Sequence, residues 1–300
     1  MDVKCLAVFT IMCTAFLPSA CGQSASANPV TGMGYSYPPV TVAPGQLISV
    51  FVAGNAQGDI GVTVQGLTAP VLQVRPPSGC AAPTICSSVT AITIQIPYEL
   101  NPGCAPLCDV LLLTQLTVTV DGVAGAPIDL SPQADQVHIL TACDTVVPGG
   151  NGIAPFNGLP CAPLVTHANG SLVTSASPAQ GGEEIVAYAV GLGATTPAVS
   201  TGQAAAVATP TVEAFYLDFN FRPNALATEP LQMAPLPTSA FPLYAGLVPG
   251  YAGLYQINFV VLQPPAGVQP CSGAVQSNLT VSVGGQTSFD GAGICVAPGE

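Results

Sequence analysis

Positive charge is almost absent from this sequence. Lys4, Arg75 and Arg222 are the only basic residues among 300, against fifteen aspartates and glutamates, so the formal net charge is −12. A surface that binds phosphates needs clustered cations, which displace counterions from the polyanion. Three isolated cations do not form such a surface. The composition therefore argues against nucleic acids and anionic membrane surfaces as partners.

Charge of either sign is scarce, because only 6% of the residues are charged, and tryptophan is missing altogether. Disordered chains combine low hydrophobicity with high net charge, whereas 49% of the residues here are hydrophobic and the mean hydropathy is +0.55. The 32 glycines and 31 prolines interrupt helices, since proline lacks an amide donor and glycine costs backbone entropy. These features predict an all-β protein with a packed core.

Long apolar runs are missing beyond the N-terminus. Residues 5–17 form a largely apolar stretch after Lys4, which is the layout of a secretory signal peptide. This stretch is shorter than the roughly 20 residues of a membrane-spanning helix, and no later segment qualifies. We expect no transmembrane segment, a signal peptide over residues 1–27, and secretion or display at a bacterial cell surface. The alternative is lipidation of Cys21 after cleavage before it, although Pro18 departs from a lipoprotein box.

Eight cysteines follow Cys21, and an even number in an exported chain indicates disulfide bonds. No two of them have the two-residue spacing that is typical of zinc sites. Their clustering along the chain favours local closures. The expected pairs are Cys80 with Cys86, Cys104 with Cys108, Cys143 with Cys161, and Cys271 with Cys295.

One pattern occurs twice in the chain. Residues 45–54 (GQLISVFVAG) align without gaps with residues 182–191 (GEEIVAYAVG), and apolar residues alternate between two glycines in both. Residues 116–122 (LTVTVDG) likewise match residues 279–285 (LTVSVGG). Alternation that ends in turn residues predicts strands and tight hairpins. The same order of strands is therefore expected in two parts of the chain.

Each copy offers about seven short strands, the number that an immunoglobulin-like sandwich needs. We expect two tandem antiparallel β-sandwich domains, at residues 28–141 and 142–298. The distance between the two repeated patterns is longer in the second copy, and we assign the extra length to a loop over residues 224–240. The junction between the domains is rich in proline and glycine (VVPGGNGIAP), as in a linker or an edge crossing.

Four stretches resemble a known family. They are residues 42–45 (VAPG), 95–100 (QIPYEL), 190–193 (VGLG) and, most specifically, 246–258 (GLVPGYAGLYQIN). In these the chain resembles the uncharacterised acidobacterial, Solibacter-type C-terminal domain family, whose sandwiches are similar to IPT/TIG modules. The resemblance implies secretion and a pair of IPT/TIG-like β-sandwiches, and it implies no known reaction.

The sequence offers little catalytic equipment. It contains no G-x-S-x-G elbow, and its histidines are His138, in an apparent strand, and His167, in a turn, where structural roles are the rule. Glu183 and Glu184 are neighbours on a strand and point to opposite faces, so they cannot act together on one bond. Glu99 is expected to accept backbone amides at a strand end. The sequence predicts no enzyme, no catalytic residues and no cofactor.

Metal sites and glycan attachment have weak signals. The chain has no D-x-D-x-D-G calcium loop, and Asp121, Asp144 and Asp290 stand beside glycine or threonine, where aspartate normally forms a turn. We expect no metal site. Asn169 and Asn278 begin glycosylation sequons, which are used only where the host has the transferase.

Three function classes are compatible with these features to different degrees. The first is a non-catalytic extracellular structural or adhesive protein that assembles with copies of itself into a surface layer or fibre. The alternative is a carbohydrate- or protein-binding module that takes cell-surface polymers as partners. An unrecognised hydrolase is a third class, which lacks convergent acid, base and nucleophile candidates. Residues 28–42 (NPVTGMGYSYPPVTV) form an arm that pairs either with a neighbouring copy or with its own domain.

Overall fold

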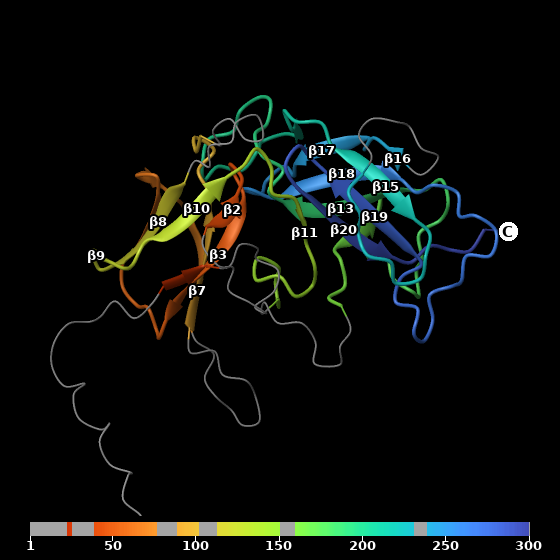
Figure 1. Ribbon diagram of the computed structural model, residues 1–300, viewed down its shortest axis with the longest axis horizontal. Helices are drawn as coiled ribbons and strands as arrows, with labels where there is room; N and C mark the ends of the chain where they lie inside the picture. The colour runs from red at the N-terminus through yellow and green to blue at the C-terminus, as the bar shows by residue number, and fades with distance from the viewer. Residues whose placement is uncertain are drawn as a thin grey trace, which may run out of the picture.

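Figure 1 shows the computed structural model, which describes residues 23–25, 39–76, 89–101, 113–150, 160–230 and 239–299. Every regular element in these residues is a β-strand, which confirms the expected all-β class. The strands form four sheets, two from each half of the chain. Nothing helical in the described ranges has the length and apolarity to cross a membrane.

The first two sheets form a sandwich from the N-terminal half. One sheet has the order β1 (Gln23–Ala25), β3 (Leu47–Ala53), β7 (Val89–Gln95) and β6 (Val71–Arg75). The other has the order β2 (Val40–Val42), β10 (Ile128–Pro132), β8 (Thr114–Val120), β4 (Ile60–Val64) and β5 (Leu67–Thr68), with β9 (Val123–Ala124) also paired to β8. Ile48 and Ile92 of the first sheet and Val62 and Leu116 of the second are buried in one shared core.

The other two sheets form a second sandwich. One has the order β11 (His138–Ile139), β13 (Glu184–Val190), β18 (Tyr255–Val260), β17 (Tyr244–Leu247) and β14 (Thr209–Pro210), with β12 (Val165–His167) also paired to β13. The other has the order β16 (Ser239–Ala240), β15 (Tyr216–Asn220), β19 (Leu279–Gly284) and β20 (Phe289–Ile294). Ile185, Tyr255, Phe219 and Val281 lie in its core.

Both halves follow the same path. In chain order, β3, β4, β6, β7, β8 and β10 occupy the same sheet positions as β13, β15, β17, β18, β19 and β20. Strands β3 and β13 each run between two glycines with positive φ, at 75° and 78° for Gly45 and Gly54 and at 84° and 78° for Gly182 and Gly191. Glycine adopts this conformation without steric cost because it has no Cβ. The repeated sequence patterns therefore mark equivalent strands.

The end of the expected arm belongs to its own half of the molecule. Strand β2 pairs parallel with β10, where Val40 lies opposite Leu130. The second sandwich has an equivalent parallel bridge between Ala179 and Val296. Residues 28–38 lie outside the described residues. Strand β1, which falls within the expected signal peptide, pairs antiparallel with β3.

Strand pairing divides the chain slightly earlier than the expected domain boundary at residue 141. Strand β11 hydrogen bonds to β13 of the second sandwich, with His138 opposite Val190. The last paired strand of the first sandwich, β10, ends at Pro132. The crossing between the two sandwiches therefore lies between Pro132 and His138. The sequence-based boundary lies later, next to the proline- and glycine-rich stretch that follows β11.

Two of the expected cysteine pairs are joined in the structure. Cys143 and Cys161 are 18 residues apart in sequence with Cα atoms 5.7 Å apart, and Cys271 and Cys295 are 24 residues apart with Cα atoms 5.8 Å apart. The second bond ties the loop before β19 to the end of β20. The other four cysteines, Cys80, Cys86, Cys104 and Cys108, and also Cys21, lie outside the described residues.

Candidate functional site

His167 links two other polar side chains at an edge of the third sheet. It ends β12, and the chain turns back so that the His167 amide donates to Ser171 O at 2.9 Å. Its Nδ1 lies 2.5 Å from Glu183 Oε1, and its Nε2 lies 3.2 Å from Ser177 Oγ. A serine, a histidine and a glutamate are therefore connected in series.

Glu183 is oriented toward His167 by its own turn. Its Oε2 accepts the Gln180 amide at 2.8 Å, and β13 begins at the next residue and pairs with β12 from Ile185 onward. The hydrogen bond to Glu183 raises the pKa of His167 more than burial lowers it. Burial by itself raises the pKa of Glu183, but the Gln180 amide and His167 outweigh that effect and lower it. The pair therefore favours an imidazolium beside a carboxylate.

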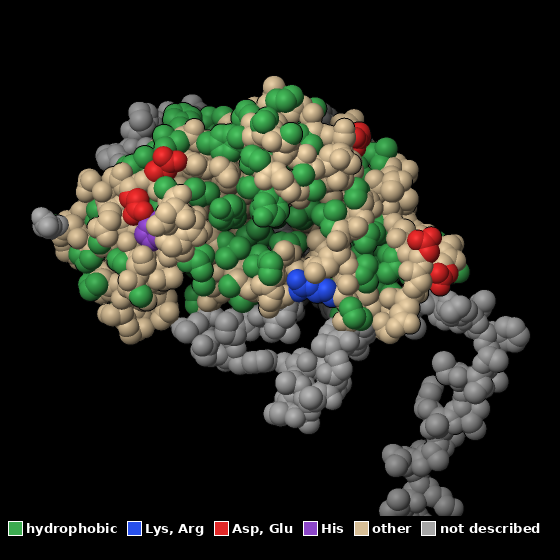
Figure 2. All heavy atoms as spheres, turned by 180° about the vertical axis from the view of Figure 1, so that it is seen from behind, with side chains coloured by type: hydrophobic (Ala, Val, Ile, Leu, Met, Phe, Trp, Pro, Cys, Tyr) green, Lys and Arg blue, Asp and Glu red, His purple; other side chains and the backbone are tan. Residues whose placement is uncertain are grey.

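These side chains line an open hollow of about 320 Å³, which Asn169 and Ser171 also line. Ser177 is exposed to solvent, and the side chain of His167 is 13% exposed. Asn169 Oδ1 accepts the Ser171 amide at 2.9 Å and the Ser171 hydroxyl at 2.7 Å. Figure 2 shows a histidine beside an acidic side chain at the surface of the rear face. The hollow is open to a ligand from solvent.

His138 occupies a different, buried cluster. Its Nδ1 lies 2.8 Å from Asp290 Oδ2, and its Nε2 lies 3.1 Å from Asp144 Oδ2. His138 is only 4% exposed, and Asp144 is fully buried. Burial by itself lowers the pKa of His138, but the two carboxylates outweigh burial and raise the pKa from 6.5 to about 9. The buried imidazole is therefore charged at neutral pH.

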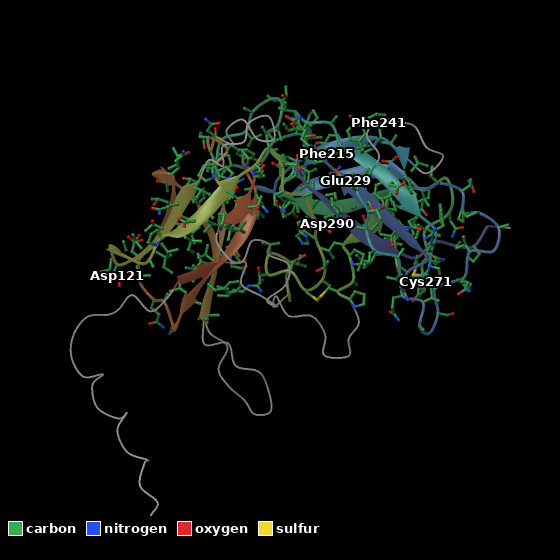
Figure 3. The ribbon with its side chains drawn as sticks, viewed as in Figure 1. Asp121, Phe215, Glu229, Phe241, Cys271 and Asp290 are labelled. Atoms are coloured by element: carbon green, nitrogen blue, oxygen red, sulfur yellow. A yellow bond between two sulfur atoms is a disulfide. The ribbon has the colours of Figure 1, made fainter. Side chains whose placement is uncertain are left out.

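This cluster joins three parts of the second sandwich. His138 lies in β11, Asp144 follows in the loop beside the Cys143–Cys161 disulfide, and Asp290 lies in β20 (Figure 3). Asp290 Oδ2 also accepts the Ile139 amide at 2.9 Å. Both ring nitrogens of His138 face carboxylates, so no catalytic proton acceptor is left free. We assign this cluster a structural role.

A larger hollow of about 590 Å³ lies on the outer face of the second sheet. It is lined by uncharged polar side chains, among them Thr63, Thr117 and Gln115, and by Asp129. Thr63 pairs directly across from Thr117 in the neighbouring strand, and Gln115 Nε2 donates to Asp129 Oδ1 at 3.2 Å. This face offers hydroxyl and amide groups rather than cations.

The two sandwiches meet through a pair of tyrosines, of which Tyr255 is fully buried and Tyr98 is partly buried. Tyr98 OH donates to Tyr255 OH at 3.2 Å, and Tyr255 OH donates to Gly193 O at 2.6 Å. Burial raises the pKa of both tyrosines, that of Tyr255 strongly. Gly45 lies against the ring of Tyr98, where a Cβ would collide with it. All four stretches that carry the family resemblance thus contribute to this junction.

Apolar and polar contacts extend the junction. Leu47 of β3 packs with Leu140 and Val190 in a small buried cluster between the sandwiches. Gly202 N donates to Gln95 Oε1 at 2.7 Å, which joins a loop of the second sandwich to the end of β7. Arg75 of β6 also bridges the two sandwiches, because its guanidinium donates hydrogen bonds to the carbonyl oxygens of Gly150 and Val147. The contact is therefore packed and hydrogen-bonded on several sides.

The remaining sequence-predicted residues have mixed outcomes. Glu99 was expected to accept backbone amides, but its Oε2 instead accepts the Thr201 hydroxyl of the other sandwich at 2.5 Å. Asp121 lies in a tight turn with φ 50°, as expected. Asn169 is exposed, whereas Asn278 is fully buried and donates to Gln269 O and Val296 O, so the folded chain offers no access to its amide.

Sequence reasoning missed the partners of both histidines. Asp290 lies 152 residues from His138, and nothing local signals their contact. Ser177 is ten residues from His167 in a loop with several other hydroxyl side chains, and no motif distinguishes it. Asp144 and Asp290 were interpreted as turn formers only, although both also bind His138. No group of three or more His, Cys, Asp or Glu side chains in the described ranges, these clusters included, is arranged to hold a metal ion.

Comparisons with known proteins return structures rather than families. No family model and no curated protein matches the chain. The Yersinia pseudotuberculosis adhesin InvE aligns over 91% of this chain and 60% of its own, at 10% identity and a TM-score of 0.19. The C-terminal domain of the Streptococcus agalactiae AgI/II polypeptide BspA aligns over 91% of this chain and 98% of its own, at 7% identity and a TM-score of 0.21. A chimeric titin Z1Z2 tandem aligns over 87% of this chain and 94% of its own, at 8% identity and a TM-score of 0.16.

Proposed function

We propose that this protein is an extracellular structural or adhesive protein that works as a stiff two-sandwich unit. The observation that carries the proposal is the junction, where Tyr98 of one sandwich donates into the buried Tyr255 of the other. Buried, hydrogen-bonded contacts resist the relative motion that is the default between domains. A stiff unit transmits position and force along its length, which suits a surface layer, a fibre or an adhesive stalk.

The chain is also built to persist outside the cell. The two disulfides within the described residues restrict the unfolded ensemble. After loss of residues 1–27, the only basic residues are Arg75 and Arg222, and each is followed by proline. Trypsin-like proteases cut poorly before proline, since the ring does not fit beyond the scissile bond. Secretion and resistance to such proteases belong together in this proposal.

Self-association is the finer part of the proposal. Figure 2 shows isolated charged side chains among wide hydrophobic areas on the rear face, so little like-charge repulsion acts locally between copies. The test compares the chain that begins at Asn28 with one that begins at Pro39, by light scattering and negative-stain microscopy. Assemblies that need residues 28–38 are the expected result. Monodisperse monomers from both chains, over a wide range of concentration and salt, would remove self-assembly and favour binding to other polymers.

A carbohydrate-binding role is the second candidate, favoured by the hollow on the second sheet. Ligand sites are concave with a few convergent polar groups, and Gln115, Asp129 and the threonine pair supply them. No lysine or arginine lines this hollow, so we expect its ligands to be uncharged rather than anionic polymers. Pulldown on neutral cell-wall glycans tests it, with the Gln115→Ala variant as the weakened form. Equal retention of the variant and the parent protein, or no retention of either, would contradict this role.

A further inference from the structure

We propose that Ser177, His167 and Glu183 form an acyl-transfer site that hydrolyses short, uncharged carboxylic esters. This activity is independent of the structural role proposed above, and it departs from the sequence-based expectation that the chain has no catalytic residues. It rests on the connection Ser177 Oγ to His167 Nε2 at 3.2 Å and His167 Nδ1 to Glu183 Oε1 at 2.5 Å. A nucleophile, a base and a group that orients the base are the three parts that such chemistry needs.

The proton on His167 decides which partner its Nε2 binds. Nε2 also lies 3.2 Å from the carbonyl oxygen of Ser177. The protonated ring donates Nε2–H to this carbonyl and holds the loop closed. The neutral ring keeps its proton on Nδ1, facing Glu183, and Nε2 then accepts the Ser177 hydroxyl proton. Because Glu183 raises the pKa of His167 above its ordinary 6.5, the reactive neutral form grows as the pH rises beyond that value.

The reaction balances with water as the only co-reactant. Ser177 Oγ loses its proton to His167 Nε2 and bonds to the carbonyl carbon of the ester. The bond from this carbon to the alcohol oxygen breaks, and the alcohol leaves with the proton from Nε2. A water molecule then gives a proton to Nε2, and its oxygen bonds to the same carbon. The bond between this carbon and Ser177 Oγ breaks, and Ser177 Oγ takes the proton back from Nε2. The products are one carboxylic acid and one alcohol.

The surroundings of the hollow indicate the substrate class. Glu183 is the one carboxylate among its lining residues, and neither Arg75 nor Arg222 lines it. A negatively charged acyl group is therefore disfavoured. The open hollow of about 320 Å³ fits a short acyl group, such as an acetyl ester that projects from a larger molecule.

Asn169 supplies a hydrogen-bond donor in the same hollow. Its Oδ1 is fixed by the amide and hydroxyl of Ser171, at 2.9 and 2.7 Å. Asn169 also lines the hollow, and carboxamide donors such as its Nδ2 group stabilise the oxyanion of acyl-transfer intermediates. Asn169 therefore has the role of donor to the developing oxyanion.

The experiment uses the mature chain, an uncharged fluorophosphonate probe and p-nitrophenyl acetate. The expected result is covalent labelling at Ser177, identified by mass spectrometry, and ester hydrolysis that increases with pH. Ser177→Ala should abolish both. Ser175→Ala is the matched control, because Ser175 is an exposed serine of the same loop, whereas the hydroxyl that meets His167 is that of Ser177, and this variant should keep both.

The roles of His167 and Glu183 have separate readouts. His167→Ala should slow hydrolysis by about 10²-fold or more, and added imidazole should restore part of the rate. Glu183→Gln should shift the pH profile of the rate to lower pH, because the charge that raises the His167 pKa is gone. Thermal unfolding of each variant shows whether it is folded. Failure of the probe to label Ser177 at alkaline pH, or equal labelling of Ser175, would overturn the proposal, whereas the assembly assay tests the structural role separately.

Discussion

At the scale of the residue, the most consequential group is His138. A buried charge is costly unless partners compensate it, and Asp144 and Asp290 do so from both sides of the ring. The same arrangement makes the folded state bind a proton more tightly than the unfolded chain does. The stability of the second sandwich is therefore linked to pH through one imidazole.

His138 should make the protein lose stability in mild alkali. Its pKa is raised from 6.5 to about 9 on folding, so its contribution is complete below pH 6.5 and is lost as the pH rises to about 9. The full contribution is about 3 kcal/mol. Urea unfolding across this pH range measures it. The His138→Gln variant should be less stable at neutral pH and should lack the alkaline decline, and an equal decline in both proteins would contradict the linkage.

Gly45 and Gly54 provide a matched pair of residues at the two ends of β3. Both have positive φ, at 75° and 78°, but a Cβ at Gly45 collides with the Tyr98 ring, whereas a Cβ at Gly54 meets nothing within 4 Å. Gly54→Ala should cost about 1 kcal/mol through backbone strain alone. Gly45→Ala should cost about 2–4 kcal/mol, since overpacking adds to the strain. Denaturant unfolding distinguishes them, and equal costs would mean that Tyr98 moves away freely.

At the scale of the element, the turn between β19 and β20 depends on a residue from the crossing segment. Asp135 is fully buried, and its carboxylate accepts the amides of Gln286 and Thr287 at 2.7 and 3.0 Å and the amide and hydroxyl of Ser288 at 2.9 and 2.6 Å. Gly285 has no space for a Cβ beside this carboxylate. The link between the sandwiches is therefore fastened to the last hairpin of the chain.

Asp135→Asn should lower the free energy of unfolding by about 2–3 kcal/mol, because one carboxamide oxygen replaces two acceptor oxygens and buried donors lose partners. Asp129→Asn is the control, since Asp129 is only partly buried and accepts one side-chain bond, from Gln115. Its effect should be within about 0.5 kcal/mol. Urea titrations give both values, and a cost at Asp135 as small as that at Asp129 would contradict the role of the carboxylate.

At the scale of the whole molecule, the two sandwiches share a path but differ in what they carry. The first bears the polar hollow on its outer sheet, and the second bears both histidine clusters and both described disulfides. The junction of Tyr98, Tyr255 and the Leu47 cluster holds them together. The molecule is thus a repeated scaffold in which both histidine clusters lie in the second copy.

A chain that begins at residue 28 should resist trypsin even after reduction and denaturation. Its two arginines, Arg75 and Arg222, both precede proline, and no lysine remains after residue 27. Electrophoresis and mass spectrometry of a digest in denaturant measure this. Pro223→Ala should create one cleavage site after Arg222 and so serves as the positive control. Cleavage of the parent chain after either arginine would contradict the expectation.

The sequence by itself determined the class of fold, the internal repeat and the two described disulfide pairs. Alternating apolar residues define a buried face for each strand, and turn glycines such as Gly45 and Gly182 mark where strands begin, so these features depend on neighbours in the chain. The Cys143–Cys161 and Cys271–Cys295 pairs followed from closeness in sequence.

Only the tertiary structure decided which polar side chains meet. His138 meets Asp290, Tyr98 meets Tyr255, and Ser177 meets His167 because of strand register, loop path and the docking of the two sandwiches. None of these contacts leaves a periodic signal, since a polar residue at a sheet edge has the same sequence pattern with or without a partner. The charge state of His138, the hydrogen bond between the tyrosines and the candidate reaction therefore depend on how strands and loops pack in the folded chain.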